Sequence, residues 1–179
     1  MPKTVHRAWF VAGALCFTAV LGVSNAIAQV VYPKTFSSIT KIDCAADGRI
    51  HIFDEHGSEF VPPAEQDQVG CADAEIATNK QAAGWLVNYK NCCTSYPVPL
   101  ALVIYQPGKP LLKLGNELML GEWHFLDGGK RVAFYSNTVH PNGPGRYELH
   151  DVKTGRLLDK WSGDVGKNSP QWMNAFDRP

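Results

Sequence analysis

Two adjacent cysteines are the residues of this chain with the most evident chemistry. Cys92 and Cys93 open the stretch CCTSYP, in which a threonine, a serine and a tyrosine follow them. Thiols can form disulfides, exchange electrons or act as nucleophiles, and neighbouring hydroxyls can contact a ligand. No catalytic or metal-binding signature accompanies the stretch. The candidate ligand-binding residues are Cys92, Cys93, Thr94, Ser95, Tyr96 and, from a later loop, His140.

The pairing of the cysteines is left open by the sequence. Beyond residue 28 the chain has four of them, Cys44, Cys71, Cys92 and Cys93, which allow three pairings. Consecutive Cα atoms lie about 3.8 Å apart, below the usual disulfide range of about 4.4–6.8 Å, so a Cys92–Cys93 bond would distort its own peptide. A Cys44–Cys71 bond would close a 28-residue segment. The alternative joins Cys44 and Cys71 to the Cys92–Cys93 loop.

Other polar residues give weaker indications of a catalytic or metal-binding site. Ser95 and His140 lack the context of a hydrolase nucleophile such as GxSxG. No CxxC pair occurs and the histidines are scattered, so we expect neither a metal nor a cofactor. Asp127 directly precedes Gly128, and Asp151 opens a turn that ends at Gly155, so both are interpreted as turn-forming residues. The histidines considered as metal ligands are His124, His140 and His150.

The N-terminal segment has the pattern of a signal peptide. Lys3 and Arg7 precede an apolar run at 9–23, and Ala26 and Ala28 then supply the small residues at −3 and −1 that signal peptidase requires. The run is short for a membrane span of about 20 residues. We therefore expect residues 1–28 to be removed and the mature chain to be periplasmic or secreted, with no membrane insertion.

The mature chain, residues 29–179, has 151 residues, the size of one domain. Removal of Lys3 and Arg7 from the 17 basic residues leaves 15 against 17 acidic side chains, a formal charge of −2. No basic stripe is present, which argues against nucleic acid and anionic membranes as partners. An even number of cysteines suits an oxidising compartment, where disulfides persist.

Short strands separated by turn residues indicate an all-β fold. The predicted strands are 48–53, 84–89, 100–105, 131–136 and 146–152. Residues 75–87 align with 124–136, and 100–114 with 147–161, which reveals an internal repeat. Residues 49–61 resemble a further copy of its second hairpin. The repeat predicts a half unit at 29–66, four-stranded units at 67–115 and 116–163, and a C-terminal tail at 164–179.

The second full unit resembles a known kind of repeat. FLDGGKRVAFYS, followed by YELHDVKTGRLL, is similar to a blade of the WD-repeat-like β-propellers of periplasmic proteins of the Tol type. One extra residue separates the glycine of the motif from the next apolar position. The mature chain also resembles exported bacterial proteins with a Gly-Trp-Leu strand followed by a Cys-Cys-Thr-Ser-Tyr-Pro loop, a resemblance that implies no activity. The matching blade positions are Asp127, Gly128, Val132, Ala133, Phe134, Asp151 and Gly155.

Propellers usually need four to eight blades, and this chain supplies at most two and a half. We therefore expect two to three blade-like antiparallel units packed as a small sandwich or partial propeller. Ser169 and Pro170 have the types of an N-cap and a first helical residue, so a short C-terminal helix is expected to cover one end of the sheets. Its apolar residues are Trp172, Met173 and Phe176, and the expected core aromatics are Trp85, Trp123 and Phe134.

The repeat also predicts where the candidate loop lies. Residues 90–99 join the second and third strands of one unit, and 137–145 occupy the same place in the next, so both should emerge at one sheet edge. The plainer alternative is that both segments are only turns, with Tyr96-Pro97 a stacked turn that a cis bond would suit. We expect an exported, non-catalytic binding or scaffold module with an unknown protein or small-molecule partner. The alternatives are an enzyme or redox factor that uses Cys92–Tyr96 with His140, and a homo-oligomer that completes a propeller.

Overall fold

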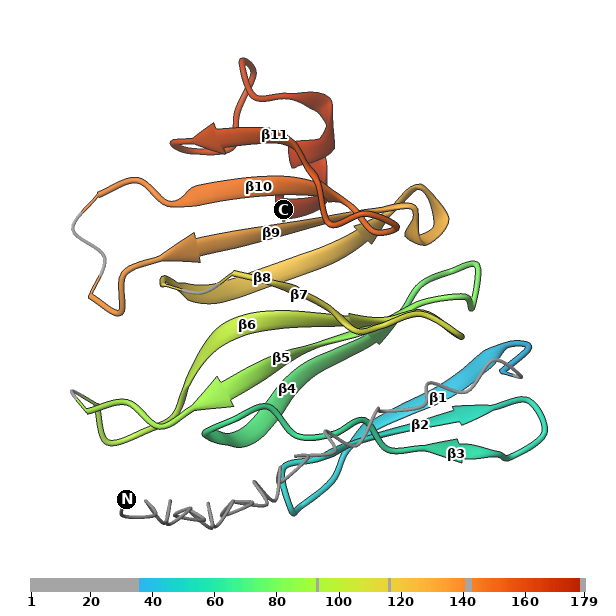
Figure 1. Ribbon diagram of the computed structural model, residues 1–179. Coiled ribbons are helices and arrows are strands. Elements are labelled where there is room, and N and C mark those ends of the chain that lie inside the picture. Colours follow the sequence, from blue (N-terminus) through green and yellow to red (C-terminus); the bar gives the residue numbers. More distant parts are fainter. Residues whose placement is uncertain (1–35, 93, 116, 141–142, 178–179) are drawn as a thin grey trace, which may run out of the picture.

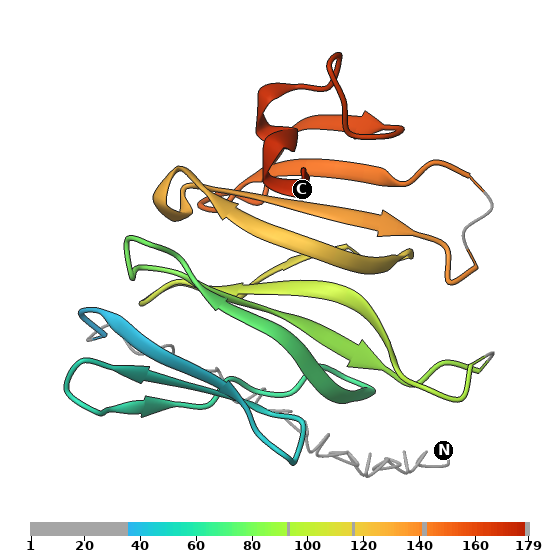
Figure 2. The same ribbon diagram turned by 180° about the vertical axis from the view of Figure 1, so that it is seen from behind.

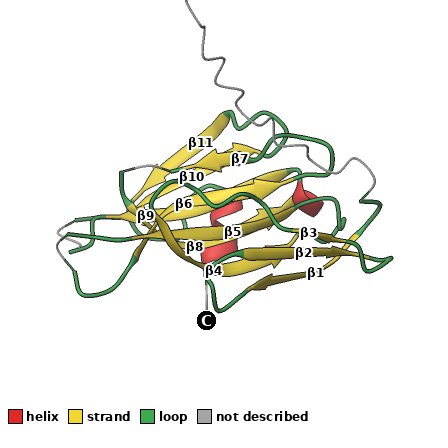
Figure 3. Cartoon of the chain, turned by 60° about the horizontal axis from the view of Figure 1, so that its bottom comes forward, coloured by secondary structure: helices red, strands yellow, loops and turns green. Residues whose placement is uncertain are grey.

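The computed structural model describes residues 36–92, 94–115, 117–140 and 143–177. The predicted signal segment lies outside these residues. The described chain has the predicted all-β fold: three antiparallel sheets stack on one another (Figure 1), and only short 3-10 helices accompany them (Figure 3). No helix within the described ranges is long and apolar enough to cross a membrane.

Each sheet is a meander, in which strands that follow one another in sequence also pair in space. The first sheet contains β1 (Ile39–Cys44), β2 (Ile50–Asp54) and β3 (Glu59–Phe60). The second contains β4 (Gln68–Ile76), β5 (Ala83–Tyr89), β6 (Val98–Tyr105) and β7 (Leu112–Leu114). The third contains β8 (Met119–Leu126), β9 (Arg131–Asn137), β10 (Arg146–Asp151) and β11 (Leu157–Ser162). Among the described residues no sheet closes into a barrel.

The strands predicted from alternation are all present. They correspond to β2, β5, β6, β9 and β10, and the predicted bounds agree within two residues at each end. The hairpin turns contain Gly57, Gly108 and Gly155, each with a φ between 71° and 76°, a region that glycine adopts without steric cost. The first strand, β1, was not among the predicted strands.

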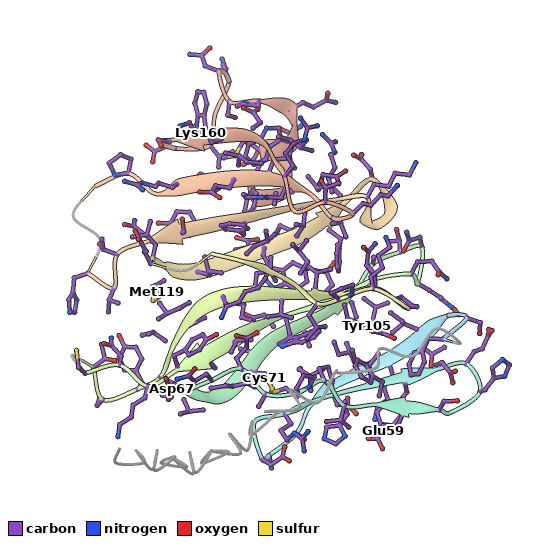
Figure 4. The ribbon with its side chains drawn as sticks, in the orientation of Figure 1. Glu59, Asp67, Cys71, Tyr105, Met119 and Lys160 are labelled. Carbon is purple, nitrogen blue, oxygen red and sulfur yellow. A yellow bond between two sulfur atoms is a disulfide. The ribbon has the colours of Figure 1, made fainter. Side chains whose placement is uncertain are left out.

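An apolar core fills the space between the first and second sheets. Alternation along β2 directs Ile50 and Ile52 into this core and His51 away from it. Tyr105 of β6, labelled in Figure 4 at the second sheet, is fully buried there. The buried side chains of this layer are Phe36, Ile39, Ile50, Ile52, Phe60, Ala83, Trp85, Val87, Ala101, Val103 and Tyr105.

The second sheet is the middle layer and is buried on both faces. Its alternate residues Leu86, Leu102 and Ile104 face the third sheet, so β5 and β6 are nearly continuous apolar runs. The predicted core aromatics are confirmed as buried, since Trp85, Trp123 and Phe134 are 3%, 4% and 2% exposed. The second core layer comprises Ala77, Ala82, Leu86, Leu102, Ile104, Leu114, Leu120, Trp123, Val132, Phe134 and Val152.

A C-terminal 3-10 helix, η2 (Gln171–Phe176), covers the outer face of the third sheet, which is an outermost layer of the stack. Met173 and Phe176 are buried there, and the Phe176 ring lies 5.0 Å from that of Tyr147. The predicted N-cap was wrong, because Pro170 occupies that position. The Ser169 hydroxyl instead donates to the Gly166 carbonyl at 2.6 Å, a local turn bond that competes with capping.

The outer face of the first sheet is polar. Lys41 forms an ion pair with Asp43, and its ammonium lies 5.1 Å from the centre of the Phe53 ring. Next to them, His51 Nδ1 lies 2.5 Å from Glu59 Oε1. This face therefore presents charged pairs, whereas the opposite face of the same sheet is apolar.

Candidate ligand-binding site

The two loops singled out by the repeat emerge at the same end of the stack. The described residues of the β5–β6 connection (90–92 and 94–97) and of the β9–β10 connection (138–140 and 143–145) lie on the left in Figure 1 and on the right in the reverse view of Figure 2. The β7–β8 connection reaches the same end, where Met119 is labelled in Figure 4. Three connections of the two four-stranded sheets thus meet the solvent at what we call the loop end.

The β5–β6 loop places its candidate residues at the surface. Tyr96 is 55% exposed, Ser95 and Cys92 are also exposed, and Thr94 is half-buried. The Thr94 hydroxyl donates to the Tyr96 carbonyl at 2.6 Å, which fixes the turn locally. The Tyr96–Pro97 peptide is trans, so the cis alternative was wrong. Cys93 lies outside the described residues.

The β9–β10 loop is shaped by a residue that the sequence did not single out. Asn137 is only 9% exposed, and its amide donates to Tyr135 Oη at 2.9 Å and to the Gly143 carbonyl at 3.4 Å. His140 is exposed, and its carbonyl accepts a bond from the Thr138 hydroxyl at 2.8 Å. The hydroxyl bonds of Thr94 and Thr138 to the Tyr96 and His140 carbonyls thus stay within their own loops. That the candidate residues share a ligand stays a prediction.

The disulfide pairing is decided for two cysteines. Cys44 at the end of β1 is bonded to Cys71 in β4, with Cα atoms 5.8 Å apart. This bond joins the first sheet to the second. The alternative in which Cys44 and Cys71 pair with the Cys92–Cys93 loop is therefore wrong, and that loop does not staple these sheets together.

A cleft opens between the second and third sheets near the loop end. One wall comes from β7 and the β7–β8 connection and the other from β10, with a volume of about 350 Å³. The floor is formed by the buried side chains of Leu120, Phe134 and Ser136. The walls are Lys113, Leu114, Gly115, Glu117, Leu118, Arg146 and Glu148. Such a size, apolar floor and charged wall are typical of small-ligand sites.

Charge on the β10 wall is held in place by a histidine. His150 Nε2 lies 2.8 Å from Glu148 Oε2, and its Nδ1 lies 3.0 Å from the Gly155 carbonyl. The imidazole also stacks on Phe134, with the ring centres 5.4 Å apart. His150, considered above as a metal ligand, instead orients the Glu148 carboxylate.

A second polar cluster lies along β4 and β8, at the other edge of the sheets. His124 Nε2 lies 2.8 Å from Glu122 Oε1, and burial raises the pKa of the neighbouring Glu75, an effect that the charge of His124 partly opposes. Sequence reasoning missed that Glu75 of β4 and His124 of β8, which belong to different sheets, lie near each other. Within the described ranges, no three His, Cys, Asp or Glu side chains are arranged to hold a metal ion.

Of the two predicted turn-forming aspartates, Asp151 bonds a turn amide with its side chain, whereas the side chain of Asp127 pairs with an arginine. Asp151 Oδ1 accepts bonds from the backbone amide and the hydroxyl of Thr154, at 2.8 and 2.7 Å, and these bonds lower the pKa of its carboxyl. Asp127 lies in the 3-10 turn η1 (Asp127–Gly129) and pairs with Arg131. The Asp151 carboxylate therefore fixes its turn, and the Asp127 carboxylate is engaged in an ion pair.

No protein-family model matches the chain, and a search of curated proteins found no relative.

Proposed function

We propose that this protein is an exported, non-catalytic binding module that meets its partner with the loop end. The observation that carries the proposal is the position of Tyr96. A large aromatic side chain is 55% exposed on a loop whose flanking strands, β5 and β6, are largely buried. Exposed aromatics on loops held by a rigid scaffold are typical of recognition surfaces.

Export is supported by the disulfide as well as by the signal pattern. A disulfide such as Cys44–Cys71 persists in oxidising compartments and is rare in the reducing cytosol. The meandering four-stranded sheets also support the resemblance to periplasmic propeller blades. The partner is accordingly a periplasmic or extracellular protein or small molecule.

The two outer faces of the stack favour a self-contained module over a propeller subunit. A ring built from copies would require the outer face of the first sheet to pack against that of the third. The former carries the Lys41–Asp43 and His51–Glu59 pairs, and the latter is covered by η2. Burying the ion pairs would cost desolvation free energy. In addition, η2 would have to move off the third sheet, which would expose the apolar side chains of Met173 and Phe176 to water.

The enzyme alternative has less support. Ser95 and His140 belong to different loops, and the hydroxyl bonds of Thr94 and Thr138 are made within those loops. A nucleophile needs a base within about 2.6–3.2 Å, which a shared loop end does not by itself provide. Binding therefore requires fewer additional assumptions than catalysis.

Site-specific photo-crosslinking tests the proposal. A benzophenone amino acid replaces Tyr96 in cells that naturally make the protein, and the control variant carries it at His56, whose side chain is 71% exposed in the β2–β3 turn. This turn lies at the opposite end of the stack (Figure 1). We expect discrete adducts from position 96 and none from position 56. Absence of adducts at 96, or the same adducts at both, would contradict the proposal.

A further inference from the structure

The cleft between β7 and β10 has an uneven distribution of charge. Arg146 is exposed on its wall, and within the described residues its guanidinium forms no ion pair. Glu148, two residues along β10, has one carboxylate oxygen held by His150, and the other accepts no hydrogen bond from the part of the chain that the structure describes. Residues two apart on a strand share a face and stand about 7 Å apart. A free cation and an oriented anion therefore lie side by side.

The floor beneath these charges is fixed, and two of its three buried side chains, Leu120 and Phe134, are apolar. In the sheet register Arg146 pairs with Ser136 and Glu148 with Phe134, so all four side chains share the face that looks toward the second sheet. Leu120, the partner of Ser136 on β8, continues this floor. An apolar side chain of a ligand inserted here would be removed from water by contact with this floor, while the polar groups of the ligand stay at the charged wall.

One end of the cleft is closed by a tight contact. A Cβ on Gly155, in the β10–β11 turn, would lie 2.6 Å from Leu112 Cδ1 of β7. The turn therefore packs directly on β7, and the cleft opens away from it, toward the loop end. A ligand enters from the side on which the β9–β10 and β7–β8 connections emerge.

We propose that this cleft binds a small zwitterionic ligand with an apolar side chain, of the class of apolar amino acids and short apolar peptides. Arg146 takes the carboxylate, since guanidinium binds carboxylate with two parallel bonds. Glu148, with Glu117 on the facing wall, takes the ammonium group. The apolar side chain lies on Phe134 and Leu120. His150 is a positioning residue that holds Glu148. The inference rests on the proposed binding function and names the chemistry of its ligand.

Calorimetric titration of the mature protein with the dipeptide Leu-Leu tests the inference, with N-acetyl-Leu-Leu-amide as the uncharged comparison. We expect saturable binding of Leu-Leu only. Arg146→Gln and Glu148→Gln should each weaken it by about tenfold or more, as loss of a hydrogen bond to a charged group implies. The control Arg49→Gln, an exposed arginine at the first sheet, should bind as the unmodified protein does.

Three results would overturn the inference: no saturable binding of Leu-Leu, equal binding of the blocked peptide, or unchanged affinity in Arg146→Gln. Thermal unfolding of each variant separates lost affinity from lost fold. Adducts at Tyr96 without Leu-Leu binding would reject the ligand class and leave the binding function standing. Leu-Leu binding without adducts would reject the loop end as the partner surface while the cleft site stands.

Discussion

The indole Nε1 of Trp123 donates a hydrogen bond to the backbone carbonyl of Asp73, 3.0 Å away. These residues are 50 positions apart, on β8 and β4, the first strands of the two four-stranded sheets. Trp123 is 4% exposed, so its bond is made where water cannot replace it. Both strands have a register shift beside the contact, between Ala72 and Glu75 and between Leu120 and Trp123.

Replacing Trp123 by phenylalanine should destabilise the fold, because the Asp73 carbonyl loses its donor. We expect the free energy of unfolding to fall by about 1–3 kcal/mol, measured by urea denaturation. Trp161→Phe is the matched control, since its Nε1 bond to the Asp164 carbonyl is long, at 3.4 Å, and exposed. That change should cost less than about 0.5 kcal/mol. Equal losses in the two variants would argue against the buried bond.

The close approach of the same indole explains a glycine in β5. A Cβ on Gly84 would lie 2.7 Å from both Ile104 Cδ1 and Trp123 Cη2. Gly84→Ala should therefore overpack the second core and lower the free energy of unfolding by about 1–3 kcal/mol. Gly166→Ala, where an added Cβ meets no atom within 4 Å, should change it by less than about 0.5 kcal/mol. A neutral Gly84→Ala would mean that the two sheets are more loosely packed than described.

The disulfide makes a prediction about stability that does not involve the loop end. Cys44→Ser with Cys71→Ser removes the bond between β1 and β4. The chain-entropy model for a closed segment of this length gives a loss of about 3.5 kcal/mol in the free energy of unfolding. Peptide mapping without reduction should recover Cys44 linked to Cys71 in the unmodified protein. A peptide linking either of them to residue 92 or 93 would contradict this pairing.

The burial of Glu75 predicts how the stability of the fold depends on pH. Because burial raises its pKa in the folded state above the ordinary value of 4.5, its stabilising contribution is present below that value. The contribution is lost as pH rises through the folded-state pKa. Glu75→Gln should therefore raise the melting temperature relative to the unmodified protein at pH 7, and the difference should shrink near pH 3.5. A variant that is less stable at pH 7 would show that His124 outweighs burial.

The strands and their grouping were accessible from the sequence because their signals are local. Alternation in β2 and the turn glycines at 57, 108 and 155 predict hairpins without knowledge of the rest of the chain. The exception is β1, where only Ile39 is buried among residues that are exposed or half-buried, so alternation is weak. The prediction of Ser169 as an N-cap was wrong because the Ser169 hydroxyl donates its hydrogen bond to the nearby Gly166 carbonyl.

The candidate sites depend on contacts between distant residues and were only partly accessible. The repeat indicates that loops 90–97 and 138–145 are equivalent, but it carries no information on the cleft between the sheets. Arg146 and Glu148 could have been noticed as opposite charges two apart on a predicted strand. That they stand above an apolar floor and beside β7 follows only from the stacking of the second and third sheets.

Light scattering on the mature protein tests most directly whether the three sheets form a self-contained module. With its polar outer face on the first sheet and η2 on the third, residues 29–179 should have the mass of one chain across a wide range of concentration. A closed ring of several chains, or a mass that grows with concentration, would contradict the proposal. It would indicate instead that copies of the chain complete a larger propeller.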